Sequence, residues 1–264
     1  MRLAKHALCL AVALLIALAP AAWALDPATT GVVLLHGKWG DPSQMRPMGE
    51  ALEEAGFKVE RPAMPWAGYR DYDRSYGEAM AEIADAVARL KALGATAIVV
   101  GGQSLGGNAT LGFATTTADL TAIMLVAPAH FPESERTGQL AGASVAKAQA
   151  MVAEGNGGDS ASFIDLNSGN RTRWQSMPAS RYLSYYDPQG PAAMSLAAPS
   201  VKVRQILWLP ATEDPAGEEF AALVVPRLPA GTRLTRHDLA GGHLDAPEAA
   251  ARVVVDMLKA VPAP

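Results

Sequence analysis

The sequence contains almost no cysteine and few charged residues. Cys9 is its single cysteine, which excludes an intramolecular disulfide and a cysteine-rich zinc or iron–sulfur site. Charged residues make up 18% of the chain, the formal net charge is −4, and no basic tract occurs. Because an acidic chain is repelled by phosphate backbones, nucleic-acid binding is not expected. Half of the 264 residues are apolar, which is enough to bury a sizeable core.

The first 24 residues have the three parts of a secretory signal peptide. Arg2 and Lys5 precede an apolar segment over 7–18, and a small-x-small site ends at Ala24. We therefore predict cleavage near Ala24 and export to a bacterial periplasm or to the medium. The apolar segment is too short to span a bilayer comfortably, and no stop-transfer charges follow it, so no stable membrane anchor is expected after cleavage.

Short apolar runs rich in β-branched residues alternate with longer segments of helical period in the remaining chain. The runs occupy 31–36, 57–61, 97–101, 121–126, 203–209 and 232–237. Between the second and third, apolar residues spaced three and four apart predict a helix over 74–93. This alternation is typical of an α/β fold with a mostly parallel sheet covered by helices.

The alternation is interrupted once, between about residues 128 and 200. This segment has no strong β-run, a small-residue helix predicted over 144–153, a Gly/Ser/Asn-rich stretch over 155–162, and several aromatic residues. A loop of this length needs structure of its own. We expect an inserted cap of short helices within a single domain over 25–264.

Residues 102–106 read G-x-S-x-G, with Ser104 at the centre. A predicted strand over 97–101 enters this motif and a small-residue helix over 106–114 leaves it, as in a strand-to-helix turn that exposes a nucleophile. Phosphate-binding loops are excluded by spacing. Gln103 occupies a position where a dinucleotide fingerprint needs glycine, and Asn108 follows Gly107 where a P-loop needs lysine.

A serine nucleophile needs a general base, and His243 is the preferred candidate. It lies in a loop after the last predicted strand and before the terminal helix. His237 falls within or at the end of that strand and is better explained as a packed or solvated residue. His130 ends the strand after the Ser104 motif, so it remains a reserve base and a candidate for lining the pocket.

Asp214 is the preferred acid of the triad because it follows a late strand and lies between Ser104 and His243 in the chain. The adjacent Glu213 stays an alternative, and Glu133 is a weaker one. Asp214 could also serve as a helix cap before Pro215.

With these motifs in this order, the chain resembles the α/β-hydrolase superfamily over essentially all of residues 25–264. The resemblance rests on the strand and His-Gly turn over 32–37, the Ser104 motif, Asp214 after a late strand, and His243 before the final helix. It implies a single α/β domain with a small helical cap. It also implies an oxyanion hole formed by the backbone N–H groups of Lys38 and Leu105. The loop after His36 lacks the glycine-rich HGGG sequence that one subgroup of the superfamily carries. The geometry of the turn does not restrict the residue type at position 103.

The predicted activity is hydrolysis of a carboxylic ester through an acyl-enzyme on Ser104, without a metal or an organic cofactor. Trp39, Trp66 and His130 are the expected substrate contacts, although aromatic residues at such positions often serve packing alone. The substrate would be a small-molecule or polymeric ester. An amidase, peptidase or thioesterase would use the same triad, and a non-catalytic binding protein of this fold is a further alternative. The oligomeric state stays open.

Overall fold

The computed structural model describes residues 24–263, so the predicted signal peptide lies outside the described residues except for Ala24. A six-stranded sheet in the order β2-β1-β3-β4-β7-β8 forms the centre, and each neighbouring pair is parallel. Its strands are β1 (Thr30–Leu35), β2 (Lys58–Glu60), β3 (Ala97–Ser104), β4 (Ala122–Pro128), β7 (Gln205–Leu209) and β8 (Arg233–Arg236). Each strand overlaps one of the six predicted runs, and the predicted α/β class is confirmed.

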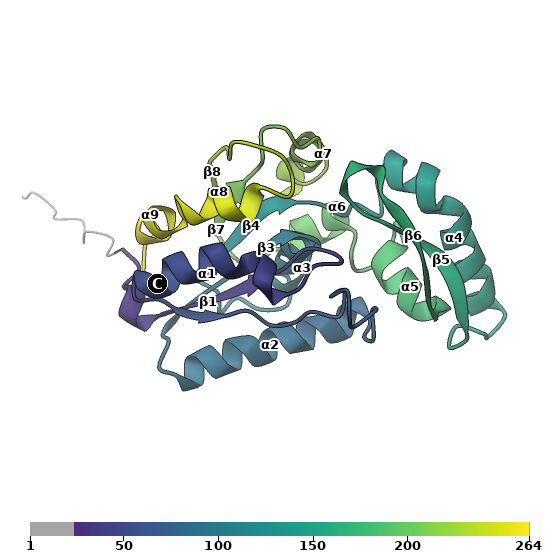
Figure 1. Cartoon of the computed structure of the whole chain (residues 1–264), viewed down its shortest axis with the longest axis horizontal. Helices are drawn as coiled ribbons and strands as arrows, with labels where there is room; N and C mark the ends of the chain where they lie inside the picture. Colours follow the sequence, from purple (N-terminus) through teal and green to yellow (C-terminus); the bar gives the residue numbers. More distant parts are fainter. Residues whose placement is uncertain (1–23, 264) are drawn as a thin grey trace, which may run out of the picture.

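Helices cover both faces of this sheet (Figure 1). They are α1 (Arg46–Glu54), α2 (Tyr76–Ala92), α3 (Leu105–Phe113), α7 (Ala216–Leu223), α8 (Ala246–Ala251) and α9 (Val254–Lys259). Successive side chains of a strand point to opposite faces, so Val33 and Leu35 pack in one cluster with α2 and α3 while Val32 and Leu34 pack in another with α1, α8 and α9. Burial on both faces explains why β1 is continuously apolar rather than alternating.

Local signals set the ends of α2. Ser75 and Glu78 form a capping box at its start, and Arg89 and Lys91 lie in its last turn, where positive charge favours the helix dipole. Ile83, Val87 and Leu90 are buried against the sheet, as their spacing predicts. Within residues 24–263 no helix is long and apolar enough to cross a bilayer.

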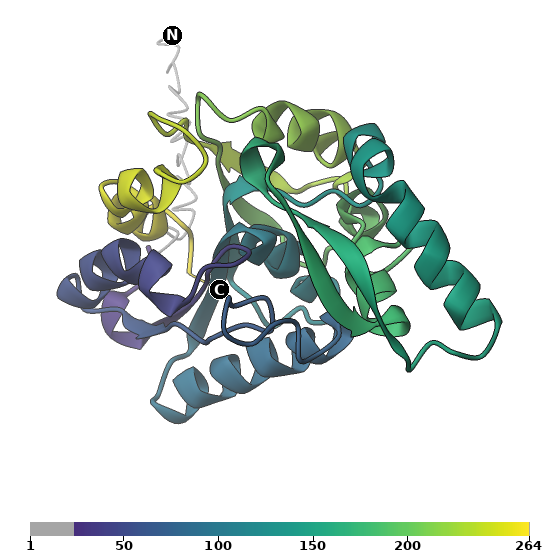
Figure 2. The same cartoon turned by 45° about the vertical axis from the view of Figure 1, so that its right-hand side comes forward.

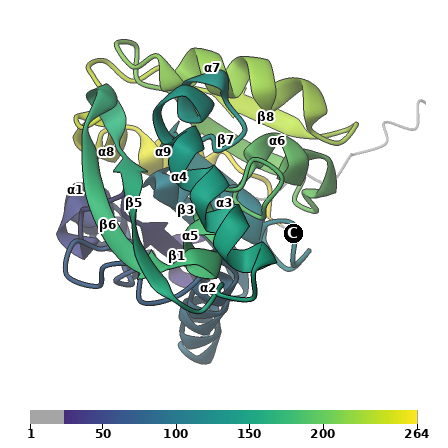
Figure 3. The same cartoon turned by 90° about the vertical axis from the view of Figure 1, so that its right-hand side faces the viewer.

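The cap lies at one end of the sheet and is not purely helical, which corrects the prediction (Figures 2 and 3). It contains an antiparallel hairpin of two strands, together with three α-helices. These elements are α4 (Glu135–Ala153), β5 (Ser160–Leu166), β6 (Thr172–Pro178), α5 (Ala179–Tyr186) and α6 (Met194–Ala197).

The hairpin was missed because its alternating pattern is weak. In β5 the buried residues are Phe163 and Asp165, and the second of these is charged, so the strand shows no apolar period of two. Helix α4 also begins nine residues before the predicted helix over 144–153, because the side chain of Ser134 accepts a hydrogen bond from the Thr137 N–H and caps it.

Candidate active site

Ser104 lies at a sharp turn where β3 ends and α3 begins. Its backbone has φ +56° and ψ −121°, a conformation that is strained for any residue other than glycine. Ser104 is nearly buried and lines a cavity at the carboxyl edge of the sheet. Strained positions of this kind persist only when surrounding contacts determine them, and they cluster at functional sites.

Two glycines make this turn possible. A Cβ atom on Gly102 would lie 2.3 Å from the carbonyl carbon of Gly106, and one on Gly106 would lie 2.3 Å from the Leu35 carbonyl oxygen. Real Cβ atoms do not approach backbone so closely. The sequence motif therefore records a steric requirement: α3 starts in contact with β3 and β1, and only glycine fits there.

His243 and Asp214 meet at the same edge of the sheet. Asp214 follows β7, and its Oδ2 lies 2.6 Å from Nδ1 of His243, whose loop follows β8. The other carboxylate oxygen of Asp214 accepts a hydrogen bond from the Ala216 N–H at 3.1 Å. Asp214 thus contacts both the imidazole and the N–H of Ala216, the first residue of α7.

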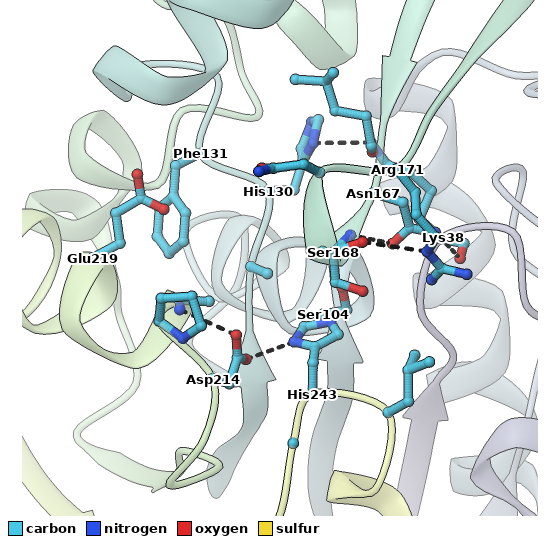
Figure 4. A pocket seen from close by; sticks show the side chains of 18 of the residues that line it. Lys38, Ser104, His130, Phe131, Asn167, Ser168, Arg171, Asp214, Glu219 and His243 are labelled. Carbon is cyan, nitrogen blue, oxygen red and sulfur yellow. Dashed lines mark hydrogen bonds and ion pairs between the residues drawn. The ribbon is translucent and has the colours of Figure 1, made fainter.

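The second ring nitrogen of His243, Nε2, is buried and has no hydrogen-bond partner in the described part of the chain. Figure 4 shows the His243 ring beside Ser104, with Asp214 on its other side. With its Nδ1–H donated to Asp214, the ring would present Nε2 as a proton acceptor in the cavity.

The alternative acids and bases make other contacts or are exposed. Glu213 is exposed and makes no hydrogen bond or ion pair with the imidazole, which bonds Asp214 instead, while Glu133 accepts a hydrogen bond from the Ser195 N–H at 2.7 Å. His237 is exposed. His130 is bonded through both ring nitrogens: Nε2 donates to the Tyr185 carbonyl at 2.7 Å, and Nδ1 accepts from Lys38 Nζ at 3.1 Å.

These contacts hold the His130 ring in its neutral form. Burial, together with the adjacent Lys38 ammonium, lowers the pKa of His130 to about 3. His130 lines the cavity but has no ring nitrogen free to accept a proton from Ser104, which leaves His243 as the better-placed base.

The backbone N–H groups of Leu105 and Lys38 are the two that the resemblance assigns to an oxyanion hole. Leu105 is the first residue of α3, so its N–H has no carbonyl partner within the helix. The Lys38 N–H has no acceptor among residues 24–263, whereas the N–H groups of Gly37 and Trp39 donate to Gln44 Oε1 and to the Trp66 carbonyl. Both N–H groups are thus left without a backbone acceptor among the described residues, and their role in an oxyanion hole stays a prediction.

His36 stabilises this loop as a neutral ring. Its Nε2 accepts a hydrogen bond from the Met64 N–H at 3.0 Å, so Nδ1 carries the proton and donates to the Gly37 carbonyl at 2.8 Å. Burial lowers the pKa of His36. The Trp66 indole donates to the His36 carbonyl at 2.8 Å.

The structure places the two predicted tryptophan contacts outside the cavity lining. Trp66 is fully buried beneath the loop, where its indole N–H satisfies the His36 carbonyl. The Trp39 indole turns to the cap and donates to Asp165 Oδ2 at 2.5 Å. Both residues serve packing and hydrogen bonding, which corrects the expectation that they contact substrate.

Gln103 has a role that sequence reasoning missed. Its side chain is buried, its Nε2 donates to the His243 carbonyl at 3.0 Å, and its Oε1 accepts from Gln44 Nε2 at 3.1 Å. Gln103 therefore connects the loop of His243 to the segment after β1, which contains both Lys38 and Gln44. No local pattern could reveal these contacts, because Gln103 and its two partners are far apart in the chain.

The cavity has a volume of about 920 Å³. Its floor contains Ser104, His243 and the apolar residues Ala129 and Phe131, and its cap side is polar, with Asn167, Ser168, Asn170, Arg171 and Arg136. Within the described residues no group of three or more His, Cys, Asp or Glu side chains is arranged to hold a metal ion.

Comparison with known proteins finds lipolytic enzymes among the proteins of similar fold. No family model matches. A thermostable monoacylglycerol lipase from Bacillus sp. (strain H-257) is 36% identical over 97 residues, a segment that covers 36% of this chain and 38% of that lipase. The match thus spans well under half of either protein.

Solved structures match over nearly the whole chain at low identity. The Paleococcus ferrophilus monoacylglycerol lipase has a TM-score of 0.64 and 23% identity, covering 88% of this chain and 95% of that one. A structure from the metagenome-derived lipolytic enzymes LipS and LipT has a TM-score of 0.63 and 20% identity, covering 91% and 98%. At these identities the likeness establishes the fold.

The space around each glycine predicts opposite effects on the free energy of unfolding for two glycine-to-alanine substitutions. Gly106→Ala should lower the free energy of unfolding by about 2 to 3 kcal/mol, because the new methyl group overlaps the Leu35 and His36 carbonyls. Gly142→Ala in α4 meets open space and should raise stability by up to about 1 kcal/mol. Urea unfolding of both variants measures the difference, and equal effects would contradict the steric account.

The buried neutral histidines predict acid destabilisation. A histidine with a folded pKa below its unfolded value of about 6.5 takes up a proton on unfolding, so stability should fall as the pH drops from 6.5 towards 3. Each such group contributes a slope of up to about 1.4 kcal/mol per pH unit. Urea unfolding over this range should show a smaller slope for His130→Asn than for wild type, while His237→Asn, at an exposed site, should keep the wild-type slope.

Proposed function

We propose that this chain, which has the α/β-hydrolase fold, is an exported serine hydrolase that cleaves carboxylic esters through Ser104, His243 and Asp214. The observation that carries the proposal is the contact of 2.6 Å between Asp214 and His243, together with the free Nε2 of that ring beside Ser104. The two monoacylglycerol lipases and the LipS and LipT enzymes that match the chain support an ester substrate.

In the first step His243 Nε2 accepts the Ser104 proton as Oγ attacks the ester carbonyl. The N–H groups of Lys38 and Leu105 would stabilise the oxyanion of the tetrahedral intermediate. When that intermediate collapses, the ester C–O bond breaks, the imidazolium gives its proton to the leaving alcohol, and the acyl group stays on Ser104.

In the second step a water molecule takes the place of the alcohol. His243 accepts a proton from the water as it attacks the acyl-enzyme, and a second collapse returns the proton to Ser104 Oγ and releases the carboxylic acid. Asp214 keeps the ring in the tautomer that carries a proton on Nδ1 and stabilises the imidazolium in both steps.

The substrate belongs to the small-molecule or polymeric esters. The polar cap side of the cavity suits an ester with hydroxyl or charged groups near the scissile bond. An amidase, peptidase or thioesterase would use the same residues, so the leaving group must be tested directly with matched p-nitrophenyl esters and p-nitroanilides of one acyl group.

The proposed triad predicts which substitutions lower esterase activity most. With p-nitrophenyl acetate and butyrate, Ser104→Ala and His243→Ala should each lower kcat about a thousandfold or more, and Ser104→Ala should abolish labelling by a fluorophosphonate probe. Asp214→Asn should lose far more activity than Glu213→Gln, since Asp214 and not Glu213 is hydrogen-bonded to the ring. Ester turnover that survives both the serine and the histidine substitutions would refute the mechanism.

Export is part of the proposal, and it rests on the charged, apolar and small-residue parts of residues 1–24. Full-length protein made in a Gram-negative host should reach the periplasm with Leu25 as its first residue, as mass spectrometry of that fraction would show. Ala24→Phe should block cleavage, because the site requires a small residue. Intact chain confined to the cytosol would overturn this part of the proposal.

A further inference from the structure

The Lys38 side chain occupies a buried polar cluster between the sheet and the cap. Its ammonium lies 3.1 Å from Asp165 Oδ1 and donates to the Leu166 carbonyl and to Tyr186 Oη, each at 2.8 Å. It also donates to Nδ1 of His130 at 3.1 Å. Three of these four partners belong to the cap, although Lys38 itself follows β1.

Asp165 is the centre of this cluster. Its carboxylate is fully buried in β5 and accepts hydrogen bonds from the Trp39 indole at 2.5 Å, from Tyr72 at 3.0 Å and from Tyr186 at 2.6 Å. Lys38 and Trp39 are consecutive residues of the loop after β1, so one carboxylate of the cap binds two neighbouring side chains of that loop.

The cap also binds the backbone of the loop. Asn167, directly after β5, donates from Nδ2 to the Lys38 carbonyl at 3.2 Å. Trp39 has φ +63°, a left-handed conformation that glycine adopts readily and tryptophan does not. Since the loop has a bulky residue where glycine would be unstrained, contacts from outside must hold it in this conformation.

We propose that Asp165 and Asn167 are positioning residues of the oxyanion hole: through Lys38 and Trp39, the cap hairpin holds the loop that presents the Lys38 N–H to the reacting carbonyl. This inference rests on the proposed function. It makes the docked cap part of the catalytic apparatus, whereas a freely opening lid would break these contacts each time it moved.

The energetics of buried charge favour such a role. Removing an ammonium and a carboxylate from water costs about as much as their attraction returns, so a buried pair adds little net stability compared with apolar residues of the same size. The contribution of the cluster is instead to fix the position of the loop after β1 relative to the cap. The hydrogen bonds of Asp165 have defined directions, which apolar packing at this interface would not provide.

The test compares Asp165→Asn and Asn167→Ala with a matched control in the same strand. Phe163 is buried in β5 and stacks on Tyr182 with a centroid distance of 4.5 Å, with no hydrogen bond to the Lys38 loop. Phe163→Leu should therefore weaken cap packing and lower Tm without moving the loop. The readouts are kcat and KM for p-nitrophenyl butyrate, Tm, and the Kd of an alkyl trifluoromethyl ketone, whose adduct on Ser104 places an oxyanion in the site.

We expect Asp165→Asn and Asn167→Ala each to lower kcat by about 10- to 100-fold, with KM changed less than threefold. The affinity for the ketone should fall by the same factor as kcat/KM, because both report binding of the oxyanion. Phe163→Leu should keep kcat and ketone affinity near wild type, whatever its Tm. A purely structural role for Asp165 would move Tm alone.

Several outcomes would overturn the inference. If folded Asp165→Asn and Asn167→Ala keep kcat within twofold of wild type, the cap does not position the donor. An equal loss of kcat in Phe163→Leu would show that general cap stability is responsible. If Asp165→Asn does not fold, Asn167→Ala decides alone, since it leaves the buried cluster intact and removes two hydrogen bonds of a partly exposed side chain, one to the Lys38 carbonyl and one from the Ser168 N–H. A wild-type protein that neither labels at Ser104 nor turns over ester would refute the proposed function itself, and the inference with it.

Discussion

The structure depends on the close approach of α3 to β3 and β1 at the Ser104 turn. Gly102 and Gly106 allow backbone to touch backbone there, at separations that leave no room for a Cβ atom. Because the sheet is parallel, the loops that follow its strands lie at the same edge. Strand order therefore brings the Asp214–His243 pair close to the serine, although the three residues are far apart in the chain. The packing of β1, β3 and α3 against one another holds the strained backbone of Ser104 in place.

A second set of contacts connects this edge to the cap. Gln103 ties the His243 loop to the loop after β1, and Asp165 and Asn167 tie that loop to the cap hairpin. The proposed base, the loop of the proposed oxyanion donor and the wall of the cavity therefore share one hydrogen-bonded network. The polar lining of the cap side follows from the same hairpin, whose tip contributes Asn170 and Arg171 to the cavity.

Sequence reasoning succeeded where the information is local or follows from strand order. Apolar runs located all six strands of the sheet, and chain order was enough to select Asp214 and His243, which the structure brings into contact. It failed where contacts are non-local. The hairpin around Asp165 has a charged residue on its buried face, Trp66 lies inside the core, and the role of Gln103 depends on partners distant in the chain. Periodicity carries no signal for such contacts, since each is specified by the packed fold.

The central claim is that Ser104 becomes covalently acylated, and the most direct measurement is mass spectrometry of the acid-quenched protein. Wild-type enzyme mixed with excess p-nitrophenyl butyrate and quenched within the first turnovers should carry one butyryl group, located on the peptide that contains Ser104. Longer incubation without fresh ester should return the mass of the free protein as water removes the acyl group. Steady ester turnover with no acylated protein, or with the acyl group on another residue, would contradict the account.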